Sequence, residues 1–170
     1  MAGTWQLVLG SVLLAGLAAA QEPAMGPTIE GVVHWPAAKI KAYPAGLKAK
    51  EPTVRGDRKS MMALERIGNR NGYSFTEERR DESGVPEMHT GLEDILIIHD
   101  GEVTMVYGGK MEDRQEPRPG EFRGSKITGG TAVKLAAGDM LLVPERVPHH
   151  MIVEKGKSVT FMAIKVQIHK

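Results

Sequence analysis

Residues 86–101 read PEMHTGLEDILIIHDG, and this stretch carries the strongest indication of fold in the 170-residue chain. Side chains two apart on a β-strand point the same way, so Glu87 and His89 are expected to face one side together. The next three residues favour a turn, which would fold Asp94 back beside them at the start of a second strand. The stretch therefore predicts two strands whose polar side chains share one surface.

The strand pattern continues beyond this stretch. Residues 94–98 form a run rich in β-branched side chains that ends at His99-Asp100-Gly101, a hairpin signal, so residues 102–107 are expected to pair back. Further short strand-like segments bounded by turn residues lie at 73–80, 132–135, 139–143, 149–153 and 159–166. Residues 110–120 are charged and are expected to form a surface loop. Because no helical period competes with this pattern, an all-β sandwich or barrel is predicted.

A second informative stretch, residues 138–149, reads GDMLLVPERVPH. It predicts a strand ending at Pro144, a tight turn with a second proline, and a returning strand that begins at His149. Imidazole and carboxylate donors brought together from separate strands suit Zn²⁺, Fe²⁺, Mn²⁺, Ni²⁺ or Cu²⁺. Spacing alone leaves open whether this stretch meets the first one in space.

Together the two stretches resemble the two motifs of the cupin superfamily, G-x5-H-x-H-x(3,4)-E-x6-G and G-x5-P-x-G-x2-H-x3-N. In the first, Glu87-Met88-His89 matches H-x-H with Glu in place of the first His, and Asp94 sits where the acidic ligand belongs. The second is matched at Gly138, Pro144 and His149, with Arg146 in place of the inner Gly and Val153 in place of the Asn. The chain is thus similar, over about residues 72–168, to an acid-substituted E-x-H cupin of secreted bacterial type.

This resemblance implies a cupin (double-stranded β-helix or jelly-roll) barrel with an N-terminal arm. It also implies that two copies of the barrel pair through their outer sheets as a homodimer. The implied metal ligands are Glu87, His89, Asp94 and His149, with Glu93 as the alternative to Asp94. Such a site resembles the two-His, one-carboxylate facial arrangement, and its carboxylates favour Mn²⁺, Fe²⁺ or Zn²⁺ over Cu²⁺. A carboxylate left uncoordinated, Glu87 or Asp94, would be the catalytic base. The alternative is a metal-free, hydrogen-bonded polar pocket.

Two further groups near these motifs have simpler interpretations. His150 should point away from His149 across its strand and so lie on the surface or at an interface. Arg79 and Arg80 are expected to be a solvated pair balanced by nearby acids. The alternative is that one of the two arginines faces inward and pairs with Glu87 or with a carboxylate substrate.

The first twenty residues have the layout of a cleavable secretory signal. An apolar run at 7–17 is followed by Ala18-Ala19-Ala20, although no Lys or Arg precedes the run. The alternative is an uncleaved N-terminal anchor. The expected organisation is a signal peptide at 1–20, an arm and linker at 21–71 and the barrel at 72–170, in the periplasm or secreted. Prolines in the arm argue against a long helix, and residues 59–66 suit either a helical turn or an edge strand.

Composition narrows the function classes. Lys and Arg number 22 against 21 Asp and Glu, giving a net charge of +1, and they are scattered, so no nucleic-acid partner is expected. The chain has no cysteine, which excludes disulfides, thiolate metal sites and a lipoprotein anchor. No stable membrane insertion is expected after signal cleavage. Two functions stay open: a metal-dependent enzyme (dioxygenase, isomerase, epimerase or lyase) acting on a small organic molecule, or a non-catalytic small-ligand-binding or sensory protein.

Overall fold

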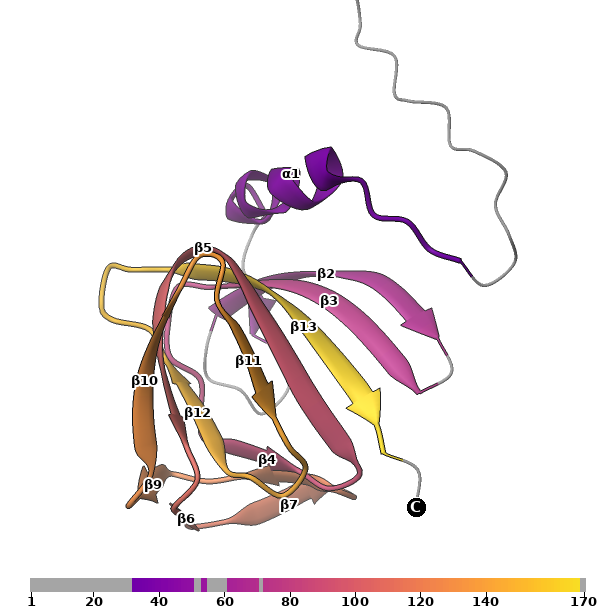
Figure 1. The fold of residues 1–170 in the computed structure, drawn as a ribbon. Coiled ribbons are helices and arrows are strands. Elements are labelled where there is room, and N and C mark those ends of the chain that lie inside the picture. The colour runs from indigo at the N-terminus through magenta and orange to yellow at the C-terminus, as the bar shows by residue number, and fades with distance from the viewer. Residues whose placement is uncertain (1–31, 51–52, 55–60, 71, 169–170) are drawn as a thin grey trace, which may run out of the picture. The chain divides into compact units, whose positions relative to one another are not determined.

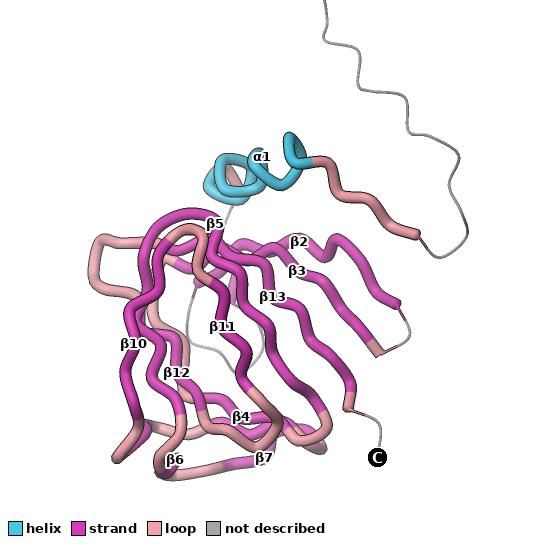
Figure 2. Tube along the Cα trace, in the orientation of Figure 1, coloured by secondary structure: helices cyan, strands magenta, loops and turns pink. Residues whose placement is uncertain are grey.

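A computed structural model describes residues 32–50, 53–54, 61–70 and 72–168 (Figures 1 and 2). Within them the chain forms one helix and thirteen strands: α1 (Ala37–Lys48), β1 (Thr53–Val54), β2 (Met61–Arg70), β3 (Tyr73–Arg80), β4 (Glu87–His89), β5 (Leu92–Tyr107), β6 (Lys110–Glu112), β7 (Gln115–Arg118), β8 (Glu121–Arg123), β9 (Lys126–Thr128), β10 (Thr131–Ala136), β11 (Met140–Val143), β12 (His149–Ile152) and β13 (Val159–Gln167). In these residues no helix is long and apolar enough to cross a membrane. The predicted signal peptide lies outside the described residues.

The strands pair antiparallel in two sheets that share the long strand β5. One sheet has the order β1-β2-β3-β13-β5-β11, and the other has the order β10-β5-β12-β4-β8-β7. A separate two-stranded ribbon joins β6 to β9. Figure 1 shows the two sheets facing each other across a common interior. The all-β expectation is therefore confirmed.

Strand β5 passes from one sheet to the other. Its first part, up to Gly101, pairs with β13 and β11, and the part from Glu102 onward pairs with β10 and β12. The expected hairpin at residues 99–101 is therefore wrong, because the two parts of β5 do not pair with each other. Gly101 has φ of +80°, and a Cβ there would collide with the carbonyl oxygen of Ser158. A glycine at this position allows β5 to bend at the point where the first residue of β13 pairs with it.

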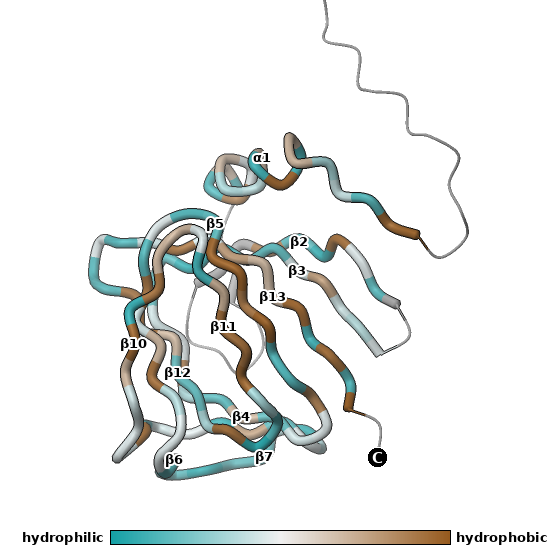
Figure 3. Tube along the Cα trace, viewed as in Figure 1, coloured by the Kyte–Doolittle hydropathy of each residue, from teal (hydrophilic) through white to brown (hydrophobic). Residues whose placement is uncertain are grey.

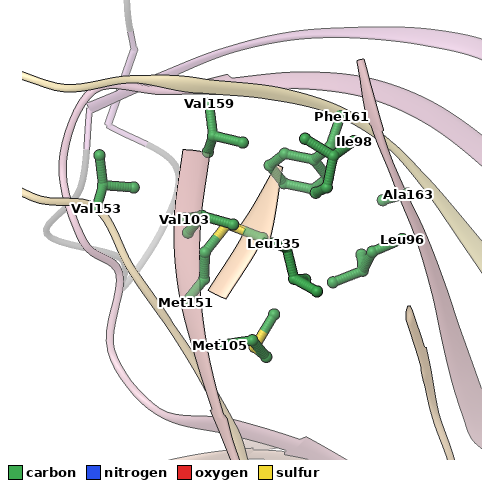
Figure 4. Packing of buried hydrophobic residues seen from close by; sticks show 10 residues of the cluster. All are labelled: Leu96, Ile98, Val103, Met105, Leu135, Met151, Val153, Val159, Phe161 and Ala163. Carbon is green, nitrogen blue, oxygen red and sulfur yellow. The ribbon is translucent and has the colours of Figure 1, made fainter. Parts of the chain in front are cut away.

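The hydrophobic core lies between the two sheets. Ten buried residues form one cluster: Leu96, Ile98, Val103, Met105, Leu135, Met151, Val153, Val159, Phe161 and Ala163 (Figure 4). They come from β5, β10, β12, β13 and the turn after β12, and in β5 they alternate with more exposed residues. Figure 3 shows hydrophobic stretches along β5, β11 and β13. Each large apolar side chain buried here contributes about 1.5–3 kcal/mol to folding.

The described part of the predicted arm contains structure that the sequence pattern does not predict. α1 packs against the sheet and buries Tyr43 and Leu47, which are four residues apart on one helix face. The helix contains Pro44, so the expectation that prolines prevent a long helix is wrong here. Burial of those two side chains offsets the cost of the interior proline. Of the two alternatives left open for residues 59–66, the strand is correct for the residues in β2.

Candidate metal centre

The four predicted site residues meet in the barrel interior. Glu87 and His89 lie on β4, Asp94 on β5, and His149 begins β12. In the register of β12 and β4, His149 lies directly opposite Glu87. Gly91, with φ of +76°, turns the chain between β4 and β5 and brings Asp94 back toward the two histidines. The two sequence stretches therefore do come together.

Some of the donor atoms have the spacing of ligands around one metal ion. Donor atoms of Glu87, His89 and His149 all lie within 4.8 Å of one another. Asp94 Oδ2 is 3.2 Å from Nε2 of His89 and 3.4 Å from Nε2 of His149. The distance from His149 Nε2 to Glu87 Oε1 is 3.9 Å. Ligands bound to one ion at about 2.0–2.2 Å with angles of 90–109° lie roughly 3–3.5 Å apart. The two contacts of Asp94 fall in this range, whereas Glu87 Oε1 lies farther from His149 and would have to move closer to bind the same ion.

The two imidazole rings are oriented by contacts at Nδ1. Nδ1 of His149 is 3.1 Å from the carbonyl oxygen of Val147, to which it can donate a hydrogen bond. Nδ1 of His89 is 3.1 Å from Glu121 Oε1, although the angle is poor for a hydrogen bond. A proton held at Nδ1 leaves the Nε2 lone pair available, and this is the tautomer that metal-binding histidines use. Both Nε2 atoms face Asp94.

The cluster is buried and strongly polar. Burial alone would raise the pKa of Asp94, but its contacts with the imidazoles of His149 and His89 and the charge of Lys165 hold it well below its usual range. Burial lowers the pKa of His89, yet Asp94 and Glu121 raise it further, so the net shift is upward. Burial opposes ionisation of Glu121, but His89 and nearby cations lower its pKa to about 2. Asp94 and Glu121 are therefore ionised at neutral pH.

Sequence reasoning missed three residues around the cluster. Glu121 and Arg123 lie on β8, opposite His89 and Glu87 respectively, and Arg123 Nη2 is 3.4 Å from Glu87 Oε2. Lys165 lies on β13 opposite Asp94, and its Nζ is 2.6 Å from Asp94 Oδ1. A lone lysine in the apolar run 159–166 is a signal that could have indicated an inward-facing charge. The alternation of Glu121 and Arg123 was a weaker signal.

Of the two candidate arginines, Arg80 faces inward. Its side chain is buried, and Nη2 is 3.4 Å from Glu78 Oε2 and 3.8 Å from Glu87 Oε1. Arg79 instead pairs with Asp81 near the surface, at 2.6 Å. The expectation of a solvated pair is therefore wrong for Arg80, because alternation along β3 places successive side chains on opposite faces.

The remaining candidates lie away from the donors. His150 is partly buried, and its Nε2 is 2.9 Å from the carbonyl oxygen of Gly84. Glu93 precedes Asp94 on β5, so its side chain alternates to the opposite face. Of the two acidic residues left open by the sequence, Asp94 is the one beside the histidines.

The cavity at the cluster is small. It has a volume of about 20 Å³ and is lined by residues of the site and core, including Glu87, Asp94, His149 and Lys165. A cavity needs roughly 10–15 Å³ of such volume to hold one water. In this conformation it therefore has room for one ion or one water, and not for an organic molecule.

The sequence matches no protein-family model, and no curated protein matches it. Among solved structures, a cupin-like protein from Thermotoga maritima is similar over 71% of this chain and 80% of its own, at 14% identity and a TM-score of 0.50. KdgF from Halomonas sp. is 11% identical over 64% of this chain and 81% of its own, with a TM-score of 0.46. The polyketide cyclase RemF from Streptomyces resistomycificus is 15% identical over 71% and 80%, with a TM-score of 0.48. The likeness to the Thermotoga protein, together with the two antiparallel sheets of this chain that β5 joins, shows the fold, an all-β cupin jelly roll.

Proposed function

We propose that this cupin-fold protein binds a first-row divalent metal ion and acts on a small organic molecule. His89 and His149 would supply two imidazole ligands, and Glu87 and Asp94 the carboxylate ligands. The observation that carries the proposal is the convergence of two imidazole Nε2 atoms on one buried carboxylate oxygen, Asp94 Oδ2, at 3.2 and 3.4 Å. Groups that all bear lone pairs lie this close only when a proton or a metal ion stands between them. Two imidazoles with carboxylates favour Mn²⁺, Fe²⁺ or Zn²⁺.

In such a site the metal would act as a Lewis acid toward a substrate oxygen. The residues around it would position and move protons. A carboxylate that is not coordinated, Glu87 or Asp94, would accept a proton from the substrate. Arg80 and Arg123 flank Glu87 on two sides and would hold its carboxylate in place.

Access for a substrate depends on movement of polar side chains, because the cavity holds only one ion or water. Lys165 is the most exposed of the cluster's charged groups, with 29% of its side chain accessible, whereas Asp94 is only 6% accessible. We therefore place the substrate entrance on the side of Lys165. The fold alone does not name the reaction, so dioxygenase, isomerase, epimerase and lyase chemistry all stay within the proposal.

A second candidate function is metal-free binding of a small ligand. The contact between the Lys165 ammonium and Asp94 favours it, since a lysine already supplies a positive charge to the buried carboxylate. In that case the pocket would be a hydrogen-bonded polar cluster that binds a small acid or sugar without catalysis.

We also propose that the chain is exported to the periplasm or secreted, and that it forms a homodimer. The support for export is the signal-like pattern of residues 1–20. N-terminal sequencing of the protein from a bacterial periplasmic fraction should give a chain that starts at Gln21. A start at Met1 in the membrane fraction would favour the anchor instead, and sedimentation of the mature protein would test the dimer.

Elemental analysis tests the metal proposal. The purified protein, reconstituted with Mn²⁺, Fe²⁺ or Zn²⁺, should retain one ion per chain, and His89→Ala and His149→Ala should retain much less. His150→Ala is the matched control, because it removes a neighbouring imidazole that contacts Gly84 and not the donor set. A wild-type protein that keeps no stoichiometric metal contradicts the proposal and favours the metal-free pocket. Full retention by both site variants contradicts the ligand assignment.

A further inference from the structure

Lys165 contacts two of the proposed metal ligands. Its Nζ is 2.6 Å from Asp94 Oδ1 and 3.0 Å from His89 Nε2. The pairing of β13 with β5 sets this contact, because it places Lys165 directly opposite Asp94. Cross-strand neighbours on one face of a sheet have their Cβ atoms about 4.5–5.5 Å apart, which is within reach of both side chains.

The lysine competes with a metal for the same lone pair. A neutral imidazole has one free lone pair, at Nε2 when Nδ1 carries the proton. That lone pair can accept a hydrogen bond from Lys165 or bind a metal ion, but it cannot do both. The ammonium also brings a positive charge to within 3.0 Å of a proposed metal ligand, and two cations this close in a buried site repel each other strongly.

The charge balance of the cluster also indicates that Lys165 and a metal ion compete. Ion pairs connect four carboxylates with three cations in this cluster. Some of the carboxylates also contact the two histidines. The carboxylates are those of Glu78, Glu87, Asp94 and Glu121, and the cations are Arg80, Arg123 and Lys165. The metal-free cluster is therefore close to neutral without any ion. A divalent ion would leave an excess of positive charge in a buried site unless one cation moved away. Lys165 is the cation with the most exposed side chain, at 29%, compared with 6% for Arg80 and 13% for Arg123.

We infer that Lys165 sets the metal affinity of this site by acting as an internal competitor of the metal. In the metal-free protein the ammonium binds Asp94 and His89, and binding of a metal ion to His89 Nε2 requires Nζ to leave that nitrogen and move toward the exposed side of the pocket. This inference rests on the proposed metal-binding function. The opposite role, in which Lys165 supports the site by holding Asp94 in position, predicts the opposite effect of removing the charge.

Zinc binding to matched lysine variants tests the inference. Lys165→Met keeps the length of the side chain and removes its charge, and Lys110→Met makes the same change at an exposed lysine whose ion pair is with Glu112. In equilibrium dialysis with Zn²⁺ alone, Lys165→Met should bind roughly tenfold more tightly than wild type or more, because the repulsion between the ammonium and the ion is gone. Lys110→Met should match wild type. Lys165→Arg, which keeps the charge, should not show the tenfold gain. Circular dichroism checks that each variant is folded.

The outcomes separate the inference from the proposed function. If wild type binds Zn²⁺ and folded Lys165→Met binds it equally or more weakly, the inference is wrong and the metal site stands. If only Lys165→Met binds Zn²⁺, the inference is supported, and the proposed metal function of the wild-type protein is contradicted. If neither protein binds Zn²⁺, both are wrong.

A measurement on the wild-type protein does not depend on how a variant folds. An amine-reactive label, read by mass spectrometry, should modify Lys165 faster after Zn²⁺ loading, because Nζ has moved toward solvent. Labelling of Lys110, whose side chain is already 77% exposed, should stay constant. Unchanged or slower labelling of Lys165 in protein that has taken up Zn²⁺ would overturn the inference.

Discussion

At the scale of single residues, the site depends on which nitrogen of each imidazole carries the proton. The carbonyl of Val147 and the carboxylate of Glu121 face the Nδ1 atoms of His149 and His89. The motif predicted that the two histidines are site residues, but it could not predict these partners. Val147 acts through its backbone, and Glu121 comes from a segment expected to adjoin a surface loop. Contacts between a metal-binding histidine and the group that faces its other ring nitrogen depend on tertiary structure more than on local sequence.

A second buried carboxyl lies away from the metal centre. Glu77 on β3 is fully buried, its Oε1 is 3.2 Å from His99 Nδ1, and neither oxygen has a hydrogen-bond partner among the described residues. Burial, with a smaller contribution from Glu65, raises the pKa of Glu77 to about 7. Burial also lowers the pKa of His99, so burial opposes the charged form of both partners.

Glu77 therefore predicts a pH dependence of stability. The folded state holds the proton of Glu77 more tightly than the unfolded state, in which the pKa of a glutamate is near its ordinary value of 4.5. The stabilising contribution is complete below that value and is lost as pH rises through about 7. Glu77→Gln mimics the protonated carboxyl, so at pH 8 it should raise the free energy of unfolding by about 2–4 kcal/mol relative to wild type.

Urea unfolding at several pH values measures this effect. Glu82→Gln, a change at an exposed acid of the following turn, is the matched control and should follow wild type. Equal pH dependence in wild type and Glu77→Gln would mean that Glu77 does not carry the effect.

At the scale of elements, the sequence predicted strands well and their connections less well. The segments around 73–80, 139–143, 149–153 and 159–166 are strands close to the predicted bounds. The turn signal at residues 99–101 was read as a hairpin, because a glycine after Asp indicates a tight turn but not which strands pair. In the structure Gly101 allows β5 to bend as it passes from one sheet to the other. The pairing depends on contacts with β13, which lies about sixty residues later in the sequence.

The bend at Gly101 can be tested by adding one methyl group. Gly101→Ala would force a side chain into a positive φ and against the carbonyl of Ser158, so it should lower the free energy of unfolding by at least about 2 kcal/mol. Gly46→Ala is the matched control, because Gly46 lies in α1 with open space around it. That change should stabilise the protein by about 0.5–1 kcal/mol. Chemical unfolding measures both variants, and a neutral Gly101→Ala would contradict the account of the bend.

The loop between β11 and β12 shows both the value and the limit of the motif comparison. Arg146 stands where the cupin pattern has glycine, and its φ is +64°. The motif position that is glycine in the cupin pattern therefore has a left-handed backbone in this chain, although the residue is arginine. Arg146 N–H donates to the carbonyl of His89 at 2.7 Å, which ties this loop to the end of β4. The contact helps to bring the two motif stretches together, and spacing alone could not predict it.

At the scale of the whole molecule, metal binding should be linked to stability. The donors come from β4, β5 and β12, so an ion bound to them would hold together strands of the two sheets. Such an ion binds the folded state and not the unfolded chain. At a free concentration of 100 times Kd it should stabilise the protein by about 2.7 kcal/mol.

Thermal unfolding checks this linkage. For a domain of this size, Zn²⁺ at that concentration should raise Tm by about 5–10 °C. The rise should be absent in His149→Ala and retained in His150→Ala. An equal rise in wild type and His149→Ala would place the zinc somewhere other than the proposed site.

The central claim is that His89 and His149 coordinate one metal ion through Nε2, and X-ray absorption at the zinc edge tests it most directly. Wild-type protein loaded with one equivalent of Zn²⁺ should show two imidazole ligands at about 2.0–2.1 Å, with oxygen donors completing the shell. His149→Ala, loaded at higher Zn²⁺ concentration, should show one imidazole, and His150→Ala should still show two. A spectrum of wild type with no imidazole scattering, or one unchanged by His149→Ala, would contradict the claim.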